Sequence, residues 1–108
     1  MTITISILTA PGFNMAATVG FIDAFRACNY LAGEPLFQWS LQHIGVDAPV
    51  ASNGIGLQSN PVEPLGKAPD IGVISTSWAP EAAYEAMTPV VRRWARFGTA
   101  LALSLIHI

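Results

Sequence analysis

The sequence predicts an α/β fold with a doubly wound, mostly parallel sheet. Segments rich in β-branched residues alternate with segments in which apolar residues recur every three or four positions. Hydrophobic residues make up 52% of the 108 residues and charged residues 11%, against a typical charged share of about 25%. That balance suits strands buried on both faces. Strands separated by helices form right-handed βαβ units, and the length allows at most one domain.

Residues that break strands and cap helices predict the first βα unit. Residues 2–9 are β-branched and apolar, as expected of a buried strand. Residues 10–13 contain Pro and Gly and break the strand. Asn14 is expected to cap a helix that begins at Met15, and Gly33 to end it. We expect an apolar stripe of this helix to face the core, with the lone cysteine as a small core residue; the stripe comprises Val19, Ile22, Phe25, Cys28 and Leu31.

The middle of the chain predicts a second strand and a hairpin. In residues 36–44, apolar and polar residues alternate and aromatic side chains are frequent, which indicates a strand. Residues 50–57 place Asn53-Gly54 between short apolar stretches, which predicts a small antiparallel hairpin. Prolines and glycines in residues 58–69 predict a loop.

The last third predicts a strand, a helix and a strand. Residues 71–75 are a short apolar strand, and residues 76–80 form the turn after it. Residues 81–97 are helical, with Pro89 splitting or kinking the helix. Residues 99–103 begin the last predicted strand.

Ligands of open parallel sheets bind at the carboxyl ends of the strands. Asn14 lies just after the first strand, beside backbone amides that could hold a carboxylate. Thr76, Ser77 and Trp78 follow the strand at 71–75 and combine two hydroxyls with an indole. These four residues are the predicted ligand-binding set. The alternative is that both segments are ordinary turns.

The sequence does not predict catalysis or a metal site. Cys28 is placed within a helix stripe, and His43 in a strand without nearby Cys, Asp or Glu at ligand spacing. No catalytic residues and no cofactor are therefore expected. The net charge is −2 without a basic stripe, which argues against nucleic-acid binding by this segment. A single cysteine, no signal peptide and no apolar run of about 18 residues predict a cytoplasmic protein without membrane contact.

Several stretches resemble one family of bacterial regulators. They are Ala10-Pro11-Gly12-Phe13, Asp23 to Gly33, Phe37-Gln38-Trp39-Ser40-Leu41, Pro49 to Gly54, Pro69-Asp70 and Arg93 to Thr99. They resemble the amino-terminal sensor domain of AraC-type transcriptional regulators, a domain of the ThiJ/PfpI, class I glutamine-amidotransferase-like superfamily. The resemblance implies a flavodoxin-like, glutamine-amidotransferase-like sheet. It also implies a small-molecule effector of the quaternary-amine or amino-acid class and a homodimer in the intact protein. DNA would be bound only by a further, carboxyl-terminal helix-turn-helix domain.

The resemblance extends to about Leu101, so we assign residues 1–101 to a partial ThiJ/PfpI-like domain that is incomplete at its C-terminus. Residues 102–108 end in Leu-Ser-Leu-Ile-His-Ile, which is similar to translated sequencing adapter. We interpret this tail as artefactual or truncated, a hypothesis that re-sequencing the coding region checks.

The resemblance implies a ligand-sensing, non-catalytic fragment, because related enzymes carry an acidic residue early in the first helix. Here Met15, Ala16, Ala17 and Thr18 occupy that stretch. Two alternatives stay open. One is a PfpI-like cysteine hydrolase or amidotransferase truncated before its nucleophile, and the other is an oligomerisation module.

Overall fold

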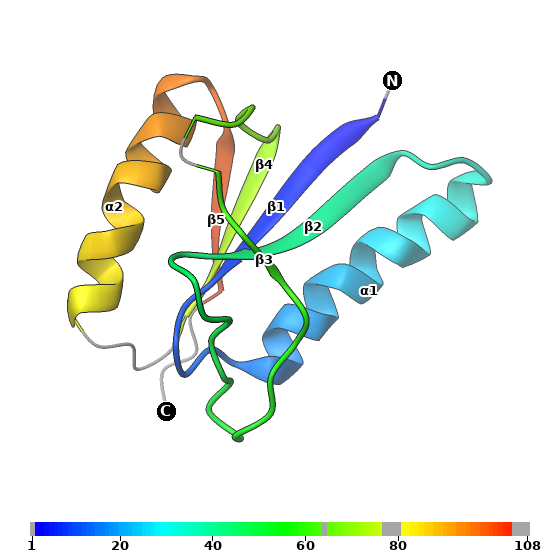
Figure 1. The fold of residues 1–108 in the computed structure, drawn as a ribbon. Helices are drawn as coiled ribbons and strands as arrows, with labels where there is room; N and C mark the ends of the chain where they lie inside the picture. Colours follow the sequence, from blue (N-terminus) through cyan, green and yellow to red (C-terminus); the bar gives the residue numbers. More distant parts are fainter. Residues whose placement is uncertain (1, 64, 77–80, 105–108) are drawn as a thin grey trace.

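The structure, a computed structural model, describes residues 2–63, 65–76 and 81–104 (Figure 1). Strands and helices follow the predicted alternation. The elements are β1 (Ile3–Thr9), α1 (Met15–Ala32), β2 (Phe37–His43), β3 (Asn60–Pro61), β4 (Ile71–Ser75), α2 (Glu81–Arg96) and β5 (Ala100–Ser104). Among these residues, neither helix combines the length and apolar character needed to cross a bilayer.

The five strands form one all-parallel sheet in the order β3-β2-β1-β4-β5. Helices α1 and α2 lie on opposite sides of it (Figure 1). The predicted α/β, doubly wound class is therefore confirmed. If the two-residue β3 is set aside, the remaining strands follow the first four positions of the flavodoxin-like order.

Strand β1 separates two apolar clusters. Ile5 and Ile7 face α1 and pack with Val73 of β4. Leu8 and Ala10 face the other side and join a cluster with Met87 and Trp94 of α2. Side chains on successive residues of a strand point to opposite faces, so this one strand supplies both halves of the core.

The segment between β2 and β4 differs from the sequence prediction in one respect. The predicted hairpin corresponds to an antiparallel bridge between Val50 and Gly56, with the Ala51 N–H donating to the Ile55 carbonyl at 2.9 Å. The predicted loop at 58–69, however, contains β3. Proline lacks a backbone N–H and is confined to sheet borders, and Pro61 lies in the strand at that border.

The predicted buried stripe of α1 is wrong at its ends. Thr18, Ile22 and Phe25 face the sheet, whereas Cys28 is exposed and Leu31 is 83% exposed. An α-helix turns about 100° per residue, so a run of three-residue spacings drifts around it. Val19 and Cys28 point in directions about 180° apart. Only the middle of the predicted stripe reaches the core.

Pro89 does not divide the second predicted helix, because α2 continues from Glu81 to Arg96. The Pro89 side chain is exposed, while Met87 and Trp94 are buried on the side of the sheet. A proline at a solvent-facing position costs one intrahelical hydrogen bond without disturbing the buried face.

We expect Gly72→Ala to destabilise the fold by about 1–3 kcal/mol, because the added methyl overpacks the core. A Cβ at Gly72 would lie 2.7 Å from Cε3 of Trp94, a side chain that is 3% exposed and has little room to move. Urea denaturation measures the change. The control is Gly20→Ala in α1, where a Cβ meets no atom within 4 Å; it should stabilise the helix by about 0.5–1 kcal/mol. Equal effects of the two changes would contradict the packing argument.

Asp70 makes the stability pH-dependent. Hydrogen bonds from the Thr4 backbone N–H (2.9 Å) and hydroxyl (3.1 Å) lower the pKa of the Asp70 carboxyl from its usual 3.8. The charged form is favoured in the folded state, so its contribution is complete above the usual value and is lost as pH falls through the lowered pKa. The difference in unfolding midpoint between wild type and Asp70→Asn should stay constant near neutral pH and shrink in acid. A constant difference throughout would contradict this.

Candidate functional site

The carboxyl edge of the sheet at β1 and β4 is where the strand order reverses. The chain leaves β1 through α1 to reach β2 on one side, while β4 lies on the other side of β1. The Ala10 N–H donates to the Ser75 carbonyl at 3.2 Å and joins the two strand ends. In sheets of this type, ligands bind in the crevice at the switch point.

Asn14 occupies one side of this edge. It is the N-cap of α1, as predicted, and its Oδ1 accepts from the Ala17 N–H at 2.8 Å. Its carbonyl accepts from the Thr18 N–H and from the Thr18 hydroxyl, at 3.1 and 2.8 Å. The cap uses both oxygens of Asn14, so the side-chain Nδ2 group is what remains for a ligand.

The bridged segment at 50–56 packs against the turn between β1 and α1. The Gly12 N–H donates to the Val50 carbonyl at 2.8 Å, and the Ser52 N–H donates to the Phe13 carbonyl at 3.0 Å. Gly12 has φ of 79°, a conformation that side chains rarely adopt. The segment therefore fixes the start of α1. No described residue accepts from the N–H groups of Met15 and Ala16 in the first turn, which leaves two helix-terminal donors at this edge.

Thr76 lies at the other side of the edge and is buried. Its hydroxyl donates to the Tyr84 Oη of α2 at 3.4 Å. The structure thus brings Asn14 and Thr76 to the same edge of the sheet but directs them toward different helices. The other predicted ligand-binding residues, Ser77 and Trp78, lie outside the described residues. Whether the set binds a ligand stays a prediction.

A polar row that was not predicted lies beneath α1 at the same edge. Thr9 is in register with His43 of β2 and with Ser75 of β4, and all three side chains are buried. The Thr18 hydroxyl of α1 hydrogen-bonds to the Ser75 hydroxyl, and the Thr9 hydroxyl donates to the Gln42 carbonyl at 3.1 Å. Thr9, His43 and Ser75 are the last residues of their strands. A polar residue at the end of each predicted strand was the sequence signal that could have identified the row.

His43 is incompletely bonded within this row. Its Nδ1 lies 2.7 Å from the Ser59 hydroxyl, while its buried Nε2 has no partner among the described residues. A buried polar atom without a partner costs about 1–3 kcal/mol. The edge therefore combines hydroxyls, helix-start amides and one imidazole, which are groups that bind polar ligands through hydrogen bonds.

Cys28 is remote from this imidazole. Asn29 bonds to both backbone groups of Phe37, the first residue of β2, whereas His43 is the last. A seven-residue strand spans about 20 Å. The cysteine and the histidine therefore form no catalytic pair. In the described part of the chain, no three His, Cys, Asp or Glu side chains gather as a metal site.

Comparison with known proteins finds a structural relative but no sequence relative. No protein-family model matches the chain, and no curated protein matches it. The structure is similar to that of an AraC family transcriptional regulator from Pseudomonas putida, with a TM-score of 0.82 and 19% sequence identity. The match covers 94% of this chain and 55% of the regulator, so the chain spans about half of that protein's length.

We expect Thr18→Val to destabilise the fold by about 1–3 kcal/mol, because it leaves the buried Ser75 hydroxyl without its partner. Adding Ser75→Ala should cost less than the sum of the two single changes, since both partners are then removed. Chemical denaturation of both single variants and the double variant gives the coupling. Strict additivity would show that the two hydroxyls contribute independently.

Proposed function

We propose that this chain is the ligand-sensing, non-catalytic part of an AraC-type transcriptional regulator, with a ThiJ/PfpI-like, glutamine-amidotransferase-like domain. The observation that carries the proposal is the structural similarity to an AraC family regulator over 94% of this chain. The family motifs between Ala10 and Thr99 support the same subtype. DNA binding belongs to a separate helix-turn-helix domain of the intact, cytoplasmic protein.

The effector binds at the carboxyl edge, between the start of α1 and the end of β4. The helix-start amides and Asn14 suit a carboxylate or another hydrogen-bond acceptor, and Thr76 adds a hydroxyl next to α2. A zwitterionic quaternary amine or an amino-acid derivative carries such a carboxylate. Effector binding shifts the regulator between two states only if its affinity differs between them.

We propose a non-catalytic role because the side chains that a related enzyme would need are not brought together. Met15, Ala16 and Ala17 begin α1 without an acidic group, and Cys28 is exposed far from His43. The dimer of the intact regulator is part of the proposal too. The adjacent side chains of Tyr30 and Leu31 at the end of α1 are both exposed and support it, because they offer an apolar surface to a partner.

The sensing role is tested by thermal unfolding of the chain with glycine betaine, choline and L-alanine as probes. Ligand that binds only the folded state raises the unfolding midpoint. We expect at least one carboxylate-bearing probe to raise it, and Thr76→Val to reduce the rise because the variant lacks the edge hydroxyl. Trp78→Ala should also reduce the rise, because Trp78 belongs to the predicted ligand-binding set.

The matched control is Thr99→Val. Thr99 is also buried, but its hydroxyl donates to the Pro69 carbonyl at 2.7 Å, at the opposite end of the sheet. It should leave the rise in midpoint intact. A rise that survives both Thr76→Val and Trp78→Ala would remove these residues from the site. Coding sequence with a Gly-x-Cys turn and no helix-turn-helix motif would refute the regulator and favour the hydrolase.

A further inference from the structure

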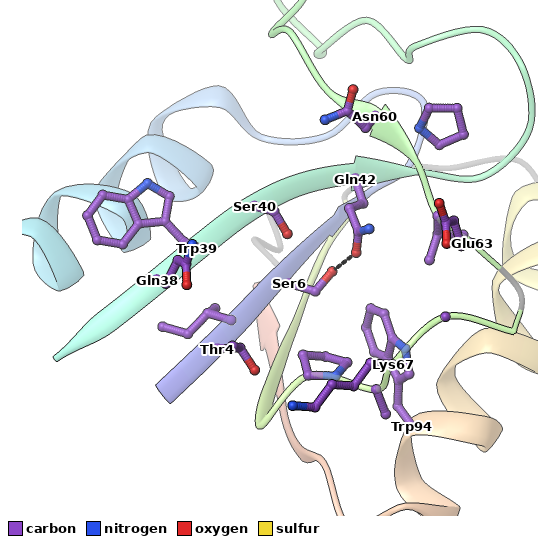
Figure 2. Close-up of a pocket in the computed structure, with 16 residues that line it drawn as sticks. Thr4, Ser6, Gln38, Trp39, Ser40, Gln42, Asn60, Glu63, Lys67 and Trp94 are labelled. Carbon is purple, nitrogen blue, oxygen red and sulfur yellow. Dashed lines mark hydrogen bonds between the residues drawn. The ribbon is translucent and has the colours of Figure 1, made fainter. Parts of the chain in front are cut away.

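A hollow of about 890 Å³ lies on the face of the sheet opposite α1. Its volume falls within the range of about 300–1,000 Å³ that small-molecule sites occupy. Figure 2 shows Gln38, Ser40 and Gln42 along β2 on one side of it, with Lys67 and Trp94 on the other. Of the ligand-binding residues predicted from sequence, the two that the structure describes, Asn14 and Thr76, do not line this hollow.

The floor of the hollow is polar because β2 alternates strictly. Phe37, Trp39 and Leu41 pack on the α1 side, so the side chains between them point the other way. Among the described residues, Gln38 and Ser40 make no side-chain hydrogen bond and are exposed. Gln42 accepts from the buried Ser6 hydroxyl through Oε1 (Figure 2), which leaves its Nε2 group as a donor.

The opposite wall adds an indole. Trp94 is 3% exposed and lines the hollow, yet no described residue accepts from its Nε1–H. The exposed Glu63 and Lys67 also line the hollow and carry opposite charges, and Asp70 lies next to the lining, bonded to Thr4.

The polar groups that line the hollow determine which class of ligand it can bind. Amides, a hydroxyl and an indole N–H offer both donors and acceptors. The floor carries no charged side chain and the rim carries charges of both signs, so the floor favours a neutral ligand. An apolar helix face would leave these groups buried and unsatisfied, so helix docking fits the floor poorly. We propose that the hollow is a second binding site, for a neutral polyhydroxylated molecule. The proposal does not depend on the effector site at the strand ends.

Nuclear magnetic resonance of the ¹⁵N-labelled chain tests this site, with D-glucose and myo-inositol as neutral probes and acetate and choline as charged ones. We expect saturable shifts of the side-chain amides of Gln38 and Gln42 and of the Trp94 indole N–H with a neutral probe only. Ser40→Trp should abolish them by filling the hollow. Gln38→Ala should weaken binding up to about tenfold, the equivalent of about one hydrogen bond.

Gln58→Ala is the matched control, an exposed glutamine outside the hollow, and should bind as wild type does. Thr76→Val should also retain binding, which separates this site from the one at the strand ends. No shift with either neutral probe, equal binding by Gln38→Ala and Gln58→Ala, or equal shifts with charged probes would each overturn the proposal. If Ser40→Trp fails to fold, the glutamine pair decides alone.

Discussion

The hydrogen-bonded and packed position of β1 is the constraint on which the rest of the structure depends. It pairs with β2 on one side and with β4 on the other, along most of its length. Ile5, Ile7 and Leu8 are at most 2% exposed, so the strand is sealed on both faces. Because the helices pack on opposite sides of it, a disturbance of β1 reaches both apolar clusters together. The turn that leaves β1 also sets where α1 begins, and thereby places the first-turn N–H groups of α1 at the edge of the sheet.

Polar side chains are distributed differently on the two faces of the sheet. On the α1 side, apolar layers give way to a polar row at the strand ends, where one ring nitrogen of His43 has no partner in the described part of the chain. On the other side, the β2 half of the sheet is polar along its whole length, while the β4 half is apolar under Trp94. Buried polar networks fix a unique geometry only when all their members are bonded. The edge row departs from that condition at one atom, beside the strand reversal.

Much of the fold could be predicted from local signals. The cap at Asn14, the glycine at Gly33 and the strand at 71–75 follow from short-range chemistry that one sequence displays. The packed face of α1 was mispredicted because spacing fixes a face only when it matches the helical period. Strand β3 escaped notice because two residues beside a proline carry little pattern. The strand-end positions of the polar row were visible in the sequence, but which residues lie side by side in the row and in the hollow depends on register between strands distant in sequence.

The proline in β3 has a consequence for how the sheet can be enlarged. A further strand needs a row of free N–H and C=O groups on the border it joins. The β3 border offers two residues, one of them Pro61, and so presents almost nothing to pair with. At the opposite border, no described residue pairs with the outer side of the five-residue β5. A strand added beside β3 would therefore find little to bond to, whereas one added beside β5 would meet a partner of five residues.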